Sequence, residues 1–281
     1  MPADAAREST LWRMILSSWG VAVFAATALA YALAALPDER SRAWAPRALT
    51  VGWLLHAFTV VLDTLSVDAQ GALSARFGFA PVLSATVWLV LGVYVIESRF
   101  LPLPGVRRVF ALLGAAVVLL SLAFPGDIRA PATSPWAPLH WLLGVASYGL
   151  FGAAVLHASL LDGAERRMRL KHSANGAGPM GLPLLRLERL TFRFVDAGFV
   201  VLTAALILGI GFLPHWRWDH KTVFSLLGWL VLGSLMIGRH VNGWRGRYAT
   251  RWLYVGAALL LLAYAGSRFV FEVLLHRQPP V

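Results

Sequence analysis

The chain contains no cysteine among its 281 residues. It therefore cannot form a disulfide bond, carry a CxxC redox pair or bind a metal through a thiolate. A metal would have to be held by histidine, methionine, tyrosine or carboxylate side chains.

Charged residues are scarce, at 14% of the chain against about 25% in soluble proteins. Hydrophobic residues make up 58%, and the mean hydropathy is +0.66. This composition excludes an ordinary soluble domain and indicates a polytopic membrane protein.

Eight apolar runs are bounded by clusters of arginine, proline or glycine. Most approach or exceed the ~20 residues that a helix needs to cross a bilayer. The first run is also longer than the ~7–15-residue apolar region of a signal peptide. We therefore expect an all-α bundle of eight transmembrane helices, forming one integral membrane domain over residues 1–281. The runs are 11–36, 48–67, 80–96, 106–124, 136–161, 194–213, 223–238 and 252–275.

The net charge of +11 would suggest a nucleic-acid partner in a soluble chain. Here the basic residues gather after the first, third, fifth and seventh runs. The positive-inside rule places these connections in the cytoplasm and both termini in the periplasm. We therefore expect membrane lipid, and no nucleic acid, beside the basic residues.

The longest connection, residues 162–190, is predicted to be a cytoplasmic linker. Its basic start fits a topology determinant next to anionic lipid, and a regulatory docking site is the alternative. Residues 184–194 mix arginine and glutamate with leucine and phenylalanine, which favours an amphipathic helix in the interface.

His140 begins the fifth run at the outer face, with Gly144 and Tyr148 below it on the same helical face. A glycine one turn from a histidine leaves a slot in which a flat macrocycle could lie. The alternative is a polar residue that anchors the helix end.

His220 begins the seventh run on the same membrane side, in a tryptophan-rich stretch with Trp216 and Trp218. Two imidazoles at one depth could bind an iron from both axial directions. Asp219 could orient an imidazole, or it could cap the helix. His140 and His220 are thus the predicted metal ligands.

The segment 216–221, Trp-Arg-Trp-Asp-His-Lys, leads into a helix with Trp229, and at these residues the chain resembles the cytochrome c assembly protein family. The resemblance covers roughly residues 139–281, including Gly-Trp-Arg-Gly at 243–246. It implies a non-catalytic inner-membrane protein that binds b-type haem non-covalently and works with other cytochrome c maturation proteins. His140 then matches the family's periplasmic haem-ligating histidine.

The chain departs from the larger members of that family. His220 stands where they usually carry proline, and an internal histidine of theirs falls at Ile237. A large periplasmic domain is missing as well. These differences favour the smaller HemX-like branch, which is associated with haem or tetrapyrrole metabolism.

Other histidines offer weaker candidates. His56 lies inside the second run, where an ionisable group is costly. It is therefore a functional candidate for contact with haem or substrate. The alternative is a hydrogen bond to the carbonyl of a neighbouring helix. His276 is a reserve ligand near the C-terminus. His157 and His240 fall at cytoplasmic helix ends, where the helix dipole explains His240.

Arg268 and Glu272, one turn apart in the last run, are expected to neutralise each other, with a haem propionate as the alternative partner of Arg268.

Three functions remain open at this stage. The first is a haem-binding protein that accepts, holds or exports haem for cytochrome c maturation. The second is a membrane regulator or assembly factor of tetrapyrrole metabolism without haem transfer. The third is a small-molecule transporter, which should show broken helices or inverted repeats that the sequence does not display.

Overall fold

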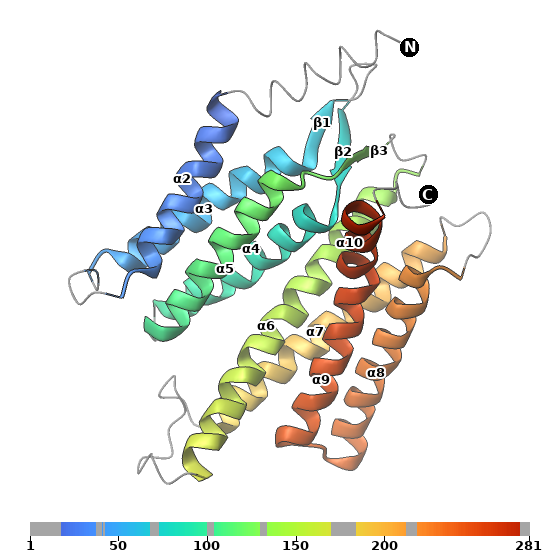
Figure 1. The fold of residues 1–281 in the computed structure, drawn as a ribbon. Helices are drawn as coiled ribbons and strands as arrows, with labels where there is room; N and C mark the ends of the chain where they lie inside the picture. Colours follow the sequence, from blue (N-terminus) through green and yellow to red (C-terminus); the bar gives the residue numbers. More distant parts are fainter. Residues whose placement is uncertain are drawn as a thin grey trace. The chain divides into compact units, whose positions relative to one another are not determined.

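The computed structural model describes residues 18–37, 41, 43–67, 73–99, 104–129, 134–169, 184–211 and 218–275. Long helices dominate these residues (Figure 1). They are α2 (Ser18–Ala35), α3 (Ala45–Thr64), α4 (Phe79–Ser98), α5 (Pro104–Ala123), α6 (Ala137–Arg169), α7 (Leu184–Ile210), α8 (His220–Asn242) and α9 (Gly246–Leu261).

The last helix changes its winding beyond α9. It continues through the π-helical turn η2 (Leu262–Gly266), the short α10 (Ser267–Phe269) and a second π-helical turn, η3 (Val270–Leu274). Within the described ranges, seven helices are long and apolar enough to cross a membrane, and 19–35 forms a shorter apolar helix. The prediction of an all-α multi-pass bundle is therefore confirmed.

A small antiparallel sheet accompanies the helices, with strand order β1-β2-β3. The strands are β1 (Leu65–Val67), β2 (Leu73–Phe77) and β3 (Asp127–Arg129). Phe77 pairs with Asp127 at the end of the sheet next to two glycines. A Cβ on Gly78 would lie 2.6 Å from the Cα of Gly126, whose φ of 76° favours glycine. The close approach of these two backbone segments requires both glycines.

The helices form two compact units. Unit 1 consists of Met1–Ile96, Pro104–Thr133 and Leu275–Val281, and unit 2 consists of Glu97–Leu103 and Ser134–Leu274. A single domain over residues 1–281 stays a prediction.

Unit 1 packs α2, α3 and α5 around the ring of Tyr31. A Cβ on Gly52 of α3 would lie 2.9 Å from that ring, and one on Gly114 of α5 would lie 2.8 Å from it. Trp53 and Trp88 stack at 5.7 Å between ring centroids, and each indole N–H donates to the backbone carbonyl of the other residue. These reciprocal bonds fasten α3 to α4.

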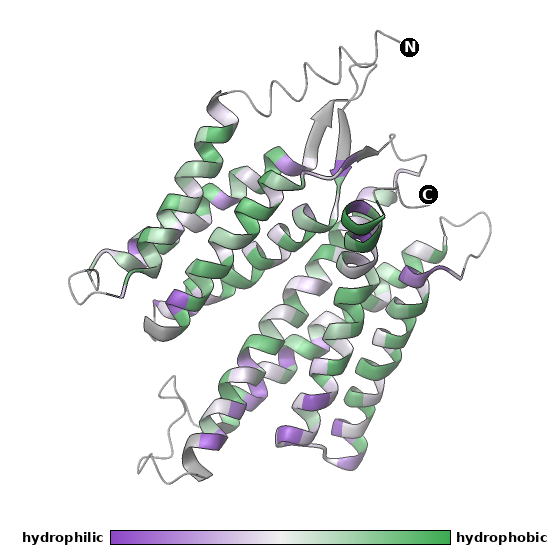
Figure 2. Ribbon diagram, viewed as in Figure 1, coloured by the Kyte–Doolittle hydropathy of each residue, from purple (hydrophilic) through white to green (hydrophobic). Residues whose placement is uncertain are grey.

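Unit 2 packs α6 against α7 and α9, and α8 against α9. Small residues bring α8 and α9 close together: a Cβ on Gly256 would lie 2.6 Å from Leu232, and one on Gly228 would lie 2.8 Å from Leu260. Figure 2 shows hydrophobic residues along the helices of unit 2 and hydrophilic residues gathered where α6 ends and α8 leads into α9. This distribution gives unit 2 one polar end. That this end faces the cytoplasm stays a prediction.

The predicted linker 162–190 is wrong at both ends. Helix α6 runs to Arg169 and α7 begins at Leu184, so residues 170–183 alone of this stretch lie outside the described part. The segment 184–194 is the first half of α7, not a separate interfacial helix. The burial of Leu187, Thr191 and Phe192 explains this, because their side chains need the rest of unit 2 to cover them.

Candidate functional site

His140 lies in the first turn of α6, and its imidazole reaches α7. The Nδ1 atom is 2.8 Å from the backbone carbonyl oxygen of Ala205. A carbonyl oxygen can only accept a hydrogen bond, so Nδ1 carries the hydrogen and the lone pair of the neutral ring is at Nε2. Metal-ligating histidines are oriented in this way by a backbone carbonyl on the opposite nitrogen.

Gly209 provides the surface against which this imidazole lies. A Cβ on Gly209 would be 2.9 Å from Cε1 of His140 and 3.4 Å from its Nδ1. Ala205 and Gly209 are four residues apart and share one face of α7. Sequence reasoning missed both residues, since a carbonyl and a missing side chain leave no signal beyond this spacing.

Gly144 lies one turn below His140 on α6. A Cβ on Gly144 would meet no other heavy atom of the described residues within 4 Å. The structure thus leaves open space at the Cβ position of Gly144, and a slot beside His140 stays a prediction. What fills this space stays a prediction.

Tyr148, the next residue on this face, has a structural role. Its hydroxyl donates a hydrogen bond to the carbonyl oxygen of Leu260, at the end of α9. The ring also lies within electrostatic range of the Tyr264 phenol. The hydroxyl thus fastens α6 to the last helix immediately before its π-helical turn, and contact of Tyr148 with a ligand stays a prediction.

Two cations flank Tyr264 near His140. The Lys221 ammonium lies 5.9 Å from the Tyr264 ring centroid, and the Arg268 guanidinium carbon lies 5.8 Å from it. Lys221 is also within electrostatic range of the His140 imidazole. The predicted pairing of Arg268 with Glu272 is present, at 3.4 Å between Nη1 and Oε1. This end of unit 2 thus combines an oriented imidazole with positive charge.

The structure describes part of the tryptophan-rich stretch at the start of α8. Asp219 is the N-cap of α8, and its carboxylate accepts a hydrogen bond of 2.7 Å from the backbone N–H of Thr222. The capping interpretation is confirmed. His220 begins the helix with an exposed side chain, Trp218 is 70% exposed, and Trp216 lies outside the described residues.

His220 lies at the same end of unit 2 as His140, because the adjacent Lys221 is within electrostatic range of that imidazole. Axial ligation by the two histidines stays a prediction.

His56 belongs to unit 1 and is completely buried. Its Nδ1 is 2.9 Å from the Tyr31 hydroxyl, and its Nε2 is 2.9 Å from the Ser84 hydroxyl. The imidazole thus links α2, α3 and α4 through side-chain hydroxyls, and not through the helix carbonyl that was the alternative to haem or substrate contact. Contact between iron and His56 would require one of these bonds to break.

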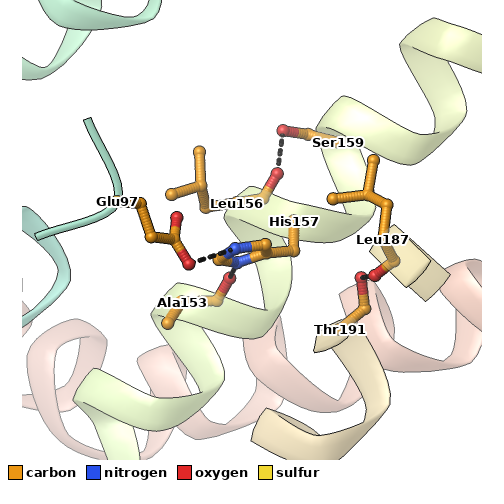
Figure 3. A network of polar contacts seen from close by, with 7 residues as sticks. All are labelled: Glu97, Ala153, Leu156, His157, Ser159, Leu187 and Thr191. Atoms are coloured by element: carbon orange, nitrogen blue, oxygen red, sulfur yellow. Dashed lines mark hydrogen bonds and ion pairs between the residues drawn. The ribbon is translucent and has the colours of Figure 1, made fainter. Parts of the chain in front are cut away.

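The remaining described histidines bond to their own helices. His240 places Nδ1 2.8 Å from the Met236 carbonyl oxygen in the last turns of α8, as a helix-end histidine should. His157 is completely buried and contacts both Ala153 and Glu97, which sequence reasoning missed (Figure 3). The reserve candidate His276 lies outside the described residues.

No group of three or more histidine, aspartate or glutamate side chains that could hold a metal ion occurs in the described part of the chain.

Comparisons with known proteins show which family this chain resembles. The model of the family described as Cytochrome C assembly protein matches residues 74–275. The "Uncharacterized 28.8 kDa protein in nifR3-like 5'region" of Azospirillum brasilense is 31% identical over 167 residues, which are 58% of this chain and 61% of that protein. No solved structure matches the chain.

Two further relatives cover more of the chain. "Inner membrane protein YpjD" of Escherichia coli strain K12 is 27% identical over 80% of this chain and 85% of its own length. "Cytochrome c biogenesis protein CcsA" of Prochlorococcus marinus is 22% identical over 77% of this chain and 80% of its own length. Together with the seven apolar helices, these relatives identify a multi-pass inner-membrane protein. The family match covers well over half of the residues, so the chain belongs to the cytochrome C assembly protein family.

Proposed function

We propose that this protein binds haem non-covalently at the His140 end of unit 2 and handles it for cytochrome c assembly. The observation that carries the proposal is the hydrogen bond from Nδ1 of His140 to the Ala205 carbonyl, which leaves the lone pair of the neutral ring on Nε2. The relatives named for cytochrome c biogenesis support the same function.

The residues present fit such a group. Haem would supply an iron that binds imidazole nitrogen, and it carries two carboxylate side chains. His140 and His220 would each provide one nitrogen to hold it. The open space at Gly144 would accommodate part of the flat ring, and the exposed Trp218 would cover its outer side, while Trp216 lies outside the described residues.

Lys221 would hold one of the carboxylates by a charge-assisted hydrogen bond, whereas Arg268 is paired with Glu272. In this proposal none of these residues breaks a bond, so the protein is a haem handler and not an enzyme. It would pass haem to other cytochrome c maturation proteins.

The test is the redox spectrum of the purified full-length protein after haem addition. We expect the low-spin b-type spectrum of an iron with two imidazole ligands, and we expect His140→Ala to abolish it. His240→Ala is the matched control, because His240 is exposed on α8 and bonds within its own helix. An unchanged spectrum in His140→Ala, or no haem binding by the parent protein, would refute the proposal.

A further inference from the structure

Glu97 and His157 both belong to unit 2, and Figure 3 shows their side chains pointing toward each other. His157 follows His140 by about 25 Å along α6 at 1.5 Å per residue. Its side chain is 0% exposed, and the Phe194 ring of α7 lies 5.2 Å away between centroids. Glu97 is the penultimate residue of α4, and its Oε2 is buried without a hydrogen-bond partner among the described residues.

The hydrogen-bond partners determine where the protons are. Nδ1 of His157 is 2.7 Å from the carbonyl oxygen of Ala153, which can only accept, so Nδ1 carries a hydrogen. Nε2 is 2.9 Å from Oε1 of Glu97. A neutral imidazole with its hydrogen on Nδ1 and an ionised carboxylate would place two acceptors against each other at this distance. The contact therefore needs one more proton.

From this count we infer that Glu97, whose side chain is 21% exposed, and the buried His157 form a proton-binding site, in which one proton lies between Nε2 and Oε1 in addition to the hydrogen on Nδ1. The proton resides on nitrogen, as imidazolium and carboxylate, or on oxygen, as neutral imidazole and carboxylic acid. Its transfer between the two atoms forms one bond and breaks the other. The pair has zero net charge in both forms.

The charged groups on the surrounding elements are engaged elsewhere. On α6, the Asp162 carboxylate accepts hydrogen bonds from Thr250 and Tyr254 of α9. On α7, Glu188 pairs with Arg239 of α8.

The other charges near this level are Asp196, Arg193, Arg247 and Arg251. Asp196 on α7 is within electrostatic range of Arg239, while Arg193 on α7 and both arginines on α9 are exposed. Among the described residues, His157 is the ion-pair partner of Glu97.

This arrangement couples the proton to the contact. Loss of the proton would leave two acceptors, Nε2 and Oε1, facing each other at 2.9 Å with a negative charge on a partly exposed carboxylate. The contact between Glu97 and α6 therefore depends on the shared proton.

Counting protons in the full-length protein at pH 7 tests the inference. Nitrogen NMR of labelled histidine reports the protons on His157, and the infrared carboxylic-acid band reports Glu97. His157→Gln and Glu97→Gln assign the two signals, and either variant is sufficient if the other does not fold. His240→Gln is the control, because His240 has the same bond to the carbonyl four residues before it.

We expect imidazolium with ionised Glu97, or a neutral imidazole with a carboxylic-acid band that Glu97→Gln removes. In Glu97→Gln the amide N–H can donate to Nε2, so His157 should become neutral with its hydrogen on Nδ1. A neutral His157 together with an ionised Glu97 in the parent protein would overturn the inference.

Discussion

The imidazole of His140 lies directly against the backbone of Gly209, with 2.9 Å between Cε1 and the position of a Cβ on that glycine. Gly209→Val would therefore push the ring away from α7 and weaken its hydrogen bond to Ala205. We expect at least a tenfold loss of haem affinity, measured by absorbance titration, with a fold stability lower by about 1–3 kcal/mol from overpacking. Gly211→Val, two residues on and exposed, is the matched control. Equal haem affinity in the two variants would show that the position of His140 does not matter.

Gly144 makes the opposite prediction, because the position that a Cβ would take on it is open. Gly144→Leu should fold and insert normally, since a Cβ there meets no described heavy atom within 4 Å. It should lower haem occupancy, because a branched side chain would occupy the space proposed for the macrocycle. Occupancy is measured by the ratio of haem to protein after purification. Full occupancy in this variant would place the ligand on another face of α6.

Asp219 separates stability from ligand binding. Asp219→Ala removes the carboxylate that accepts the hydrogen bond from the Thr222 N–H, and it should destabilise the protein by about 0.5–2 kcal/mol. Asp219→Asn should retain this stability, because asparagine caps a helix equally well. Thermal unfolding followed by circular dichroism measures this difference. If Asp219→Asn retains stability but loses haem, the carboxylate also orients an imidazole. If it retains both, the residue is a cap alone.

The helices could be predicted because their signals are local. A run of about twenty apolar residues can be recognised without knowledge of the rest of the chain. The ends of α8 are also marked, by Asp219 before the helix and by Gly243 after it, whose φ is 67°. The sheet could not be predicted, because its strands have three to five residues and Phe77 pairs with a residue fifty positions away.

The candidate site follows the same division. His140 and Gly144 could be found from helical spacing, since both are on one face of one helix. The Ala205 carbonyl and Gly209 could not, because their role depends on how α7 packs against α6. The contact between Glu97 and His157 joins residues sixty positions apart and was missed for the same reason.

The charge distribution predicts the membrane orientation, which cysteine labelling can test. The natural chain has no cysteine, so each introduced thiol is the one labelled group. Arg245→Cys, between α8 and α9, should react with a membrane-impermeant reagent only after cell lysis. Ser134→Cys, before α6, should react in cells whose outer membrane is permeable. Reversed labelling would move His140 to the cytoplasmic side and remove it from the proposed compartment.

The last prediction concerns the two axial ligands. His140 and His220 lie at the same end of unit 2, because Lys221, the residue after His220, is within electrostatic range of the His140 imidazole. If both bind one iron, alanine at either position leaves an open axial site, so the low-spin spectrum should become high-spin while haem remains bound more weakly. Added imidazole should restore the low-spin spectrum in each variant by filling the open position, and it should leave His240→Ala unchanged. If the low-spin spectrum survives in His220→Ala but not in His140→Ala, His140 is a ligand and the second ligand is a side chain other than His220. The exposed His220 would then be only the first residue of α8.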